Sequence, residues 1–173
     1  MSKKVISVGL NSKDIDRAMR EIDAYKQELL KKMETYRKRL AEEIAYEAMM
    51  NFRSAEMNDV VKGSTSKPDV EVYIDEKGSM SVIVAYGEDA VFCEFGAGVY
   101  HNGSVGSSPH PKGSELGLTI GSYGKGYGKA TAWGYYEDGE LVITRGTPAS
   151  MPMYNAVQTV AAKAITIARE VFG

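Results

Sequence analysis

Apolar residues recur every three or four positions along the first third of the chain, with polar residues between them. This spacing predicts an amphipathic helix that keeps one apolar face along its whole length. Asn11 or Ser12 can cap its start, and residues 14–57 contain neither glycine nor proline. The pattern therefore predicts a helix over 12–57, whose apolar positions are Ile15, Ala18, Ile22, Tyr25, Leu29, Met33, Tyr36, Leu40, Ile44, Ala48 and Phe52.

The predicted length of this helix has a consequence for its surroundings. At ~1.5 Å per residue it would span on the order of 60 Å, whereas a compact chain of this size is roughly 40 Å across. A straight helix would therefore project beyond its own domain. Two interpretations remain open: the helix breaks into two packed helices, or its far end forms a surface that is shared in an oligomer.

Two pairs of segments alternate apolar and polar residues, and each pair predicts a β-hairpin. The first pair is Val70–Ile74 and Ser79–Tyr86, joined by residues 75–78. The second is Ala132–Tyr136 and Glu140–Thr144, joined by residues 137–139. Residues 60–67 are expected to be a polar connector. Two further β-prone runs, around Val5–Val8 and Leu116–Ile120, are shorter.

Helical spacing returns at the C-terminus, over about residues 151–171. Ser150 is the expected cap, and Pro152 fits the first turn of a helix. The order of elements predicts an α+β fold in one domain, residues 1–173. It has a long N-terminal amphipathic helix, an antiparallel sheet of about four or five strands, a long glycine-rich loop, and a C-terminal helix packed on the sheet.

The middle of the chain changes character abruptly. Glu88–Phe95 are expected to form one or two helical turns, with Phe92 and Phe95 as core anchors. Gly96 and Gly98 then release the chain into a loop over residues 97–130, expected to be flexible. Residues 96–128 hold ten of the 18 glycines of the chain. Loops this long inside a compact domain usually have a function or are disordered.

The glycine-rich region does not match the motifs that bind nucleotides. A P-loop needs Ser or Thr directly after its Gly-Lys pair, but Ala130 follows Lys129, and Gly126 follows Lys125. A dinucleotide fingerprint starting at Gly96 would need glycine at position 101, which is His101. No cofactor is therefore expected.

Catalytic and metal sites are not indicated either. Metal-ligating residue types occur at Cys93, Glu94, His101 and His110, but without the spacing of known metal motifs. The two histidines lie in the Gly/Ser/Pro-rich loop and are expected to be solvated, and Cys93 is expected to be a buried, unreactive thiol. No nucleophile has an evident base. The sequence predicts no enzyme.

A cluster of aromatic and basic residues lies within the loop, at Tyr123, Lys125, Tyr127 and Lys129. Stacking combined with positive charge is how single-stranded nucleic acids are bound. The alternative is a loop that orders on a protein partner. The chain has a net charge of -2, so it lacks a general attraction to nucleic acid, and the protein partner is favoured.

Two blocks of the sequence together resemble a family of tailed-phage proteins. The first is Phe92-Cys93-Glu94-Phe95-Gly96-Ala97-Gly98; the second, after Trp133, runs from Thr144 through Gly146, Pro148, Pro152 and Met153 to Ala156. The family is that of tail-completion or head–tail joining proteins of long-tailed phages. Ala97 and Met153 stand where threonine and phenylalanine are common in it, and the loop over 99–130 is longer.

The resemblance implies a structural part of the virion. Such proteins form rings, hexameric by this resemblance, at the neck or tail. They contact other neck, connector and tail-tube proteins, and genomic DNA passes through without sequence-specific contact. The expected location is the virion neck or tail, and the host cytoplasm during assembly, with no membrane. The alternative is a nucleic-acid-associated phage accessory protein that uses the Tyr/Lys/Gly loop. Glu94 is expected to be structural, capping or pairing near residues 144–152.

Overall fold

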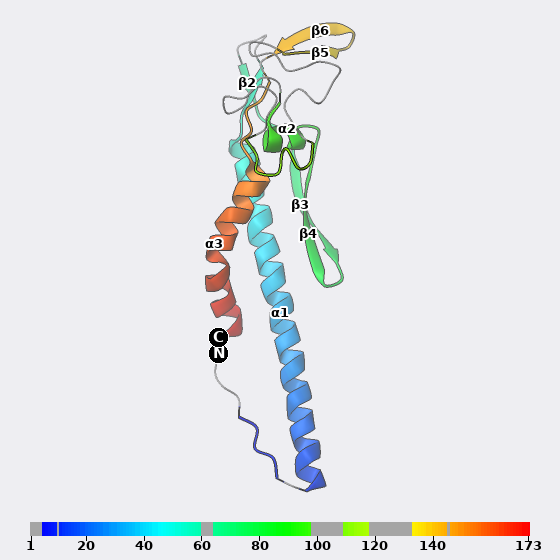
Figure 1. The fold of residues 1–173 in the computed structure, drawn as a ribbon, viewed down its shortest axis with the longest axis vertical. Helices are drawn as coiled ribbons and strands as arrows, with labels where there is room; N and C mark the ends of the chain where they lie inside the picture. Colours follow the sequence, from blue (N-terminus) through cyan, green and yellow to red (C-terminus); the bar gives the residue numbers. More distant parts are fainter. Residues whose placement is uncertain (1–4, 10, 60–63, 98–108, 118–132, 145) are drawn as a thin grey trace.

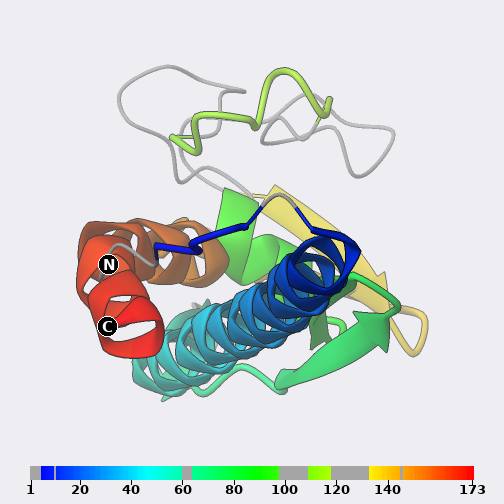
Figure 2. The same cartoon turned by 90° about the horizontal axis from the view of Figure 1, so that it is seen from below.

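The structure is a computed structural model, and it describes residues 5–9, 11–59, 64–97, 109–117, 133–144 and 146–173. Its architecture is α+β, as predicted (Figure 1). A long N-terminal helix, α1, runs through the molecule. The C-terminal helix α3 lies on one side of α1, and the hairpin of strands β3 and β4 lies on the other (Figure 2).

Helix α1 is continuous from Ser12 to Ser54. The interpretation that it breaks into two helices is therefore wrong. Its first turn is capped by Asn11, whose side-chain oxygen accepts the Asp14 N–H at 2.9 Å. It ends a turn earlier than predicted because the chain turns extended at Ala55, and Met57 already belongs to a strand. With 43 residues, the helix is about 64 Å long.

Helix α3, Pro152–Phe172, packs against the C-terminal half of α1, and the prediction that it packs on a sheet is wrong. The Tyr36 hydroxyl donates to the carbonyl oxygen of Ala164 at 3.2 Å, and the Asn51 amide donates to that of Pro152 at 3.0 Å. The many alanines of α3 allow this close approach between two helices.

Within the described residues, the strands form three separate hairpins rather than one sheet of four or five strands, which corrects the prediction. Each pair is antiparallel. Both predicted hairpins are present, and the predicted polar connector contributes one strand of a third, smaller pair, whose other strand precedes it. In the described part of the chain residues 5–9 form no strand. The pairs are β1 (Met57–Asp59) with β2 (Ser64–Ser66), β3 (Glu71–Lys77) with β4 (Met80–Tyr86), and β5 (Trp133–Glu137) with β6 (Glu140–Thr144).

The β3–β4 hairpin packs its inner face on α1. Strand β3 runs three residues further than predicted because the turn is tight, with Gly78 at a φ of 59°. Arg37 of α1 contacts both Glu76 of β3 and Ser81 of β4. These contacts fix the hairpin halfway along the helix.

A small core lies where the C-terminal end of α1 meets β3, β4 and the short helix α2, Ala90–Phe95. Its centre is Phe52, which is 2% exposed. This core holds together α2 and α3, the helices that carry parts of the two family-like sequence blocks. The remaining core residues are Ala55, Ala90 and Cys93, with Met57, Val70, Val72, Ala85 and Met153 packed around them.

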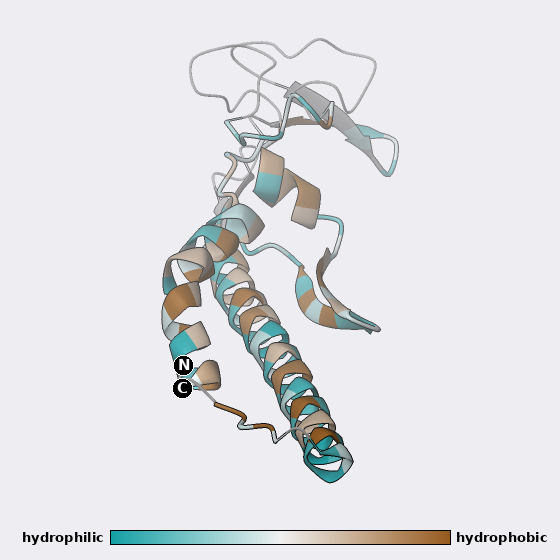
Figure 3. Cartoon of the chain, turned by 60° about the horizontal axis from the view of Figure 1, so that its bottom comes forward, coloured by the Kyte–Doolittle hydropathy of each residue, from teal (hydrophilic) through white to brown (hydrophobic). Residues whose placement is uncertain are grey.

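The N-terminal part of α1 extends past α3 and past the β3–β4 hairpin (Figure 1). Hydrophobic residues continue along this projecting part (Figure 3). Several of them are about half exposed, among them Ile15, Met19 and Ile22. In the described structure, the N-terminal part of α1 thus extends beyond the elements that pack on the rest of the helix (Figure 1).

Of the predicted glycine-rich loop, the structure describes Ala97 and residues 109–117, which form bends and turns. Leu116, expected in a brief strand, lies in such a turn, while Leu118 and Ile120 lie outside the described residues. No helix in the described part of the chain combines the length and apolar character that crossing a membrane requires.

Candidate functional site

The most constrained polar group in the described structure is the carboxylate of Glu94, at the junction of α2 and α3. Its side chain is buried, and it accepts two backbone N–H groups from the first turn of α3. Oε2 accepts from Met153 at 2.8 Å and Oε1 from Tyr154 at 2.9 Å. A negative charge at this position also interacts favourably with the positive end of the helix dipole. The prediction that Glu94 caps or pairs near residues 144–152 is confirmed by these contacts, which lie directly after that stretch.

Ser150 does not cap α3, contrary to prediction. The cap residue is Met151, in the left-handed conformation (φ 52°, ψ 50°), and its side chain makes no cap hydrogen bond. The Ser150 hydroxyl instead donates to the carbonyl oxygen of Cys93 at 3.3 Å, which also accepts the Ser150 N–H at 2.9 Å. The end of α2 thus supplies both the cap of α3 and the acceptor for the segment that precedes it.

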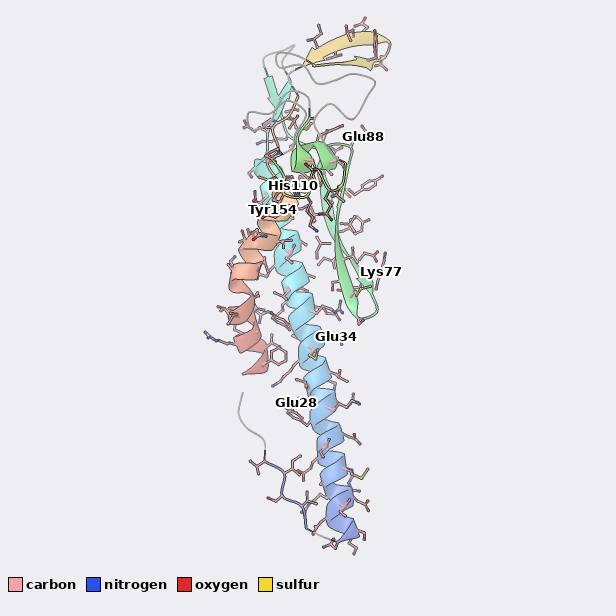
Figure 4. All side chains as sticks on the ribbon, viewed as in Figure 1. Glu28, Glu34, Lys77, Glu88, His110 and Tyr154 are labelled. Atoms are coloured by element: carbon pink, nitrogen blue, oxygen red, sulfur yellow. The ribbon has the colours of Figure 1, made fainter. Side chains whose placement is uncertain are left out.

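His110 completes the surroundings of Glu94 and is buried, not solvated as expected. Its Nε2 lies 3.1 Å from Glu94 Oε1, and its Nδ1 accepts the Lys112 N–H at 3.0 Å. Because Nδ1 is an acceptor, the ring hydrogen is on Nε2, which donates to Glu94. The ring packs against Phe95 at 4.5 Å and Tyr154 at 5.3 Å between centroids. Figure 4 shows His110 and Tyr154 next to one another beside α2.

The chemistry open to this cluster is limited by these bonds. Both imidazole nitrogens are engaged, so His110 in this arrangement has no nitrogen left to accept a substrate proton. Within the described residues, no three acidic, histidine or cysteine side chains gather as metal ligands would. The Glu94–His110 pair therefore works as a polar clamp that ties residues 109–112, α2 and α3 together.

Cys93 lies beside this clamp with its thiol inside the core. Its side chain is fully buried, and burial raises the pKa of the thiol to about 11, with the nearby carboxylates of Asp89 and Glu94 adding to the effect. The thiol is therefore neutral at physiological pH, which removes the form that acts as a nucleophile or a metal ligand. The expectation of a buried thiol is confirmed.

We predict that Cys93 of the folded protein reacts with Ellman's reagent at pH 8 at least about 100-fold more slowly than an unfolded thiol. The buried group offers almost no thiolate and little access. Because the thiol ionises near pH 8.5 when unfolded but near 11 when folded, its contribution to stability is constant below pH 8.5. It is then lost as pH rises toward 11. The rate is measured in buffer and in 6 M guanidinium; equal rates would contradict the burial. A Cys93→Ser variant lacks the thiol, so the difference between it and the wild type gives the part of the pH dependence of stability that comes from Cys93.

Gly96 ends α2 where a side chain cannot be accommodated without strain. Its φ is 81° and its ψ 160°, a region used almost only by glycine. A Cβ atom there would lie 3.2 Å from the Ala149 nitrogen and 3.3 Å from the Ala149 Cβ. The next residue, Ala97, donates its N–H to the Thr147 carbonyl at 2.8 Å. The two family-like blocks therefore lie side by side at this point.

We predict that Gly96→Ala lowers the free energy of unfolding by about 2–3 kcal/mol, because the variant adds backbone strain and a close contact with the facing segment. Gly78→Ala is the matched control, since Gly78 also has positive φ but an added Cβ meets nothing within 4 Å. Urea unfolding followed by circular dichroism measures both. Equal losses would show that the approach of residues 147–149 to Gly96 does not matter.

The structure brings several of the sequence-predicted site residues together. Glu94 accepts from Met153, the residue after Pro152, and Gly96 lies against Ala149, in the segment 146–151 that also contains Gly146 and Pro148. Phe95, between Glu94 and Gly96, stacks on His110. Trp133 is the first residue of β5. The other predicted residues lie outside the described part of the chain: Gly98, His101, Tyr123, Lys125, Tyr127 and Lys129.

The burial of His110 and its bond to Glu94 were not predicted from the sequence. His110 lies between Pro109 and Pro111, which restrict the backbone at this point of the loop. These prolines were the available signal that the segment is held in one conformation.

Models of protein families, curated proteins and solved structures were compared with this chain, and none of them matches it.

Proposed function

We propose that this chain is a structural protein of the neck or tail of a tailed phage, which completes the tail and joins it to the head. In this role, copies of the chain form a ring around the path of the DNA and contact neighbouring connector and tail-tube proteins. The proposal combines the family resemblance of the two sequence blocks with the surfaces of the folded chain. It assigns the chain no catalytic step.

The observation that carries the proposal is the projecting part of α1. Its large apolar side chains are about half exposed, with Met19 at 59% and Ile22 at 55%. Soluble monomers rarely keep a contiguous apolar surface of this kind, and such surfaces usually mark protein–protein contacts. A part of an assembly, by contrast, covers this surface with its neighbours.

The junction of α2 and α3 supports the same role from within the chain. The two family-like blocks meet there through the buried Glu94 carboxylate and the Cys93 carbonyl. A buried carboxylate with backbone donors and a histidine fixes the relative position of two helices. A rigid junction suits a component that holds fixed contacts rather than one that turns over a substrate.

The test is to remove the chain from the phage that encodes it and to examine the particles by electron microscopy. We expect DNA-filled heads and separate tails to accumulate, and infectivity to return when the chain is supplied from a plasmid. Quantitative mass spectrometry of purified wild-type particles should find several copies per particle. Infectious, fully joined particles that lack the chain would refute the proposal.

A further inference from the structure

We propose that copies of this chain associate head to tail, with the projecting part of α1 in one copy packed on the outer face of the β3–β4 hairpin in the next. This inference rests on the proposed function for its ring geometry, and it names the surfaces that form the ring. Two patches of the same chain carry it, and each is incompletely covered in the single copy.

The first patch is a line of residues on α1, called here the α1 stripe: Ile15, Met19, Ile22, Lys26, Leu30 and Met33. The steps between them are three or four residues, so they share one face of the helix. The five apolar members are between 46% and 59% exposed. The stripe is about 27 Å long at 1.5 Å per residue. Its one charged member, Lys26, lies at its centre.

The second patch is the side of the β3–β4 hairpin that faces away from α1. Its exposed apolar side chains, called here the outer face, are Tyr73, Met80, Val82 and Tyr86, between 37% and 69% exposed. Figure 4 shows side chains of this hairpin extending away from α1 on that side. The two seven-residue strands are roughly 20 Å long, which is close to the length of the α1 stripe.

Strand β4, Met80–Tyr86, also has the composition of a strand that is covered on both faces. After the alternation at its start, its sequence is apolar at five consecutive positions, Val82–Tyr86, so residues on both of its faces are apolar. In the single chain, α1 covers the inner face, where Ile83 and Ala85 lie, and leaves the outer face open. A two-stranded hairpin has little stability of its own and gains it from packing. A second helix on the outer face supplies that packing.

Charge and area point to a second copy as the occupant. The outer side of β3 carries Glu71 and Asp75, in register with Tyr86 and Val82. Asp75 already forms an exposed ion pair with Lys77 at 3.0 Å, so the Glu71 carboxylate is the one suited to the Lys26 ammonium at the centre of the α1 stripe. The exposed apolar parts of the two patches add up to on the order of 900 Å². With polar margins, the contact reaches the ~1,000 Å² or more of a stable interface.

The two patches are not able to meet within one chain, because the hairpin packs its inner face on the same helix and its outer face points away. The contact is therefore between copies and heterologous, since each copy uses one patch toward each neighbour. Repetition of such a contact gives a closed ring if the rotation closes. Layers then alternate around the ring: α1, hairpin, α1 of the next copy, and its hairpin.

The test uses the purified full chain and two variants, Ile22→Glu in the α1 stripe and Val82→Glu in the outer face. Light scattering after size exclusion gives the mass. We expect each variant to associate roughly 10- to 100-fold more weakly than the wild type, because a charge replaces a buried apolar side chain. Ala24→Glu adds the same charge on the opposite face of α1 and should associate like the wild type. Circular dichroism checks folding, and Met80→Glu replaces Val82→Glu if the latter does not fold.

Mixing the two variants separates this arrangement from a symmetric one. Each variant keeps one intact patch, so a 1:1 mixture should form dimers, with no larger species, while each variant alone stays monomeric. Monomers in the mixture, or wild-type-like assembly of Ile22→Glu, would overturn the proposal. So would a wild-type chain that remains monomeric at about 1 mM, where micromolar interfaces are saturated.

The result is independent of the phage experiment. If the variants lose self-association but the chain is dispensable for joined particles, the proposed function fails and the interface stands. If the chain is required in particles but the variants assemble normally, the interface fails and the function stands.

Discussion

Replacing Glu94 with glutamine is expected to lower the free energy of unfolding by about 2–4 kcal/mol. The carboxylate accepts N–H groups from Met153 and Tyr154 and the Nε2–H of His110. Glutamine has the same shape, but it replaces one acceptor oxygen with a donor NH₂ group. At least one buried N–H then faces another donor, and the negative charge at the start of α3 is lost.

Urea unfolding followed by far-UV circular dichroism measures this loss, and an unchanged m value would show that the extent of unfolding is the same. Glu28→Gln is the matched control, because Glu28 forms only an exposed ion pair with Lys32. We expect no measurable change for it. If Glu94→Gln is as stable as Glu28→Gln, the carboxylate does not clamp the two helices.

Phe52→Ala is expected to cost about 3–5 kcal/mol, a large part of the 5–15 kcal/mol that stabilises a typical domain. Phe52 is 2% exposed and lies at the centre of the core that joins α1 to α2 and to the β3–β4 hairpin. Truncation leaves a cavity between elements that are distant in sequence. The surrounding small residues, such as Ala55 and Ala90, have few atoms with which to fill it.

Thermal and urea unfolding of Phe52→Ala should both show the loss. Met50→Ala is the control from the same helical turn, because Met50 is 42% exposed. We expect a cost below about 1 kcal/mol for this control. Similar costs for the two variants would place the core elsewhere. A lower m value for Phe52→Ala alone would indicate that the hairpin has already separated from α1 in the folded variant.

The variants Phe52→Ala and Glu94→Gln probe two different junctions of the structure. Phe52 holds the hairpin and α2 against α1, whereas Glu94 holds the start of α3 against the end of α2. Both junctions lie at the same end of α1, and the other end of that helix extends beyond them (Figure 1). These two junctions therefore lie at one end of α1, while half-exposed apolar residues such as Met19 and Ile22 lie toward its other end.

Local patterns in the sequence determined the elements of this protein. The apolar spacing predicted α1 and α3, one or two helical turns were expected where α2 lies, and the alternation predicted both larger hairpins. These predictions succeeded because side-chain period and local capping act within a few residues of one another. Asn11 caps α1 from a position three residues before its partner Asp14, so its role was visible in the sequence.

The arrangement of these elements was not visible in the same way. Whether α1 breaks, and whether α3 packs on a helix or a sheet, depends on which apolar faces meet. The spacing of apolar residues does not specify which other element an apolar face packs against. The separation of the three hairpins could not be predicted for the same reason, because alternation predicts a strand but not the strand beside it.

The clamp shows the difference most clearly. From sequence, Ser150 is the evident cap of α3, because serine stands directly before the helix. In the fold, the side chain that accepts the first N–H groups of α3 is Glu94, 59 positions before Met153. His110 joins it from a loop that was expected to be solvated. A charged side chain is buried only where several donors converge on it. That convergence exists only after α2, α3 and residues 109–112 have come together, so the sequence predicted a structural role for Glu94 but only the tertiary structure decided its partners: Met153, Tyr154 and His110.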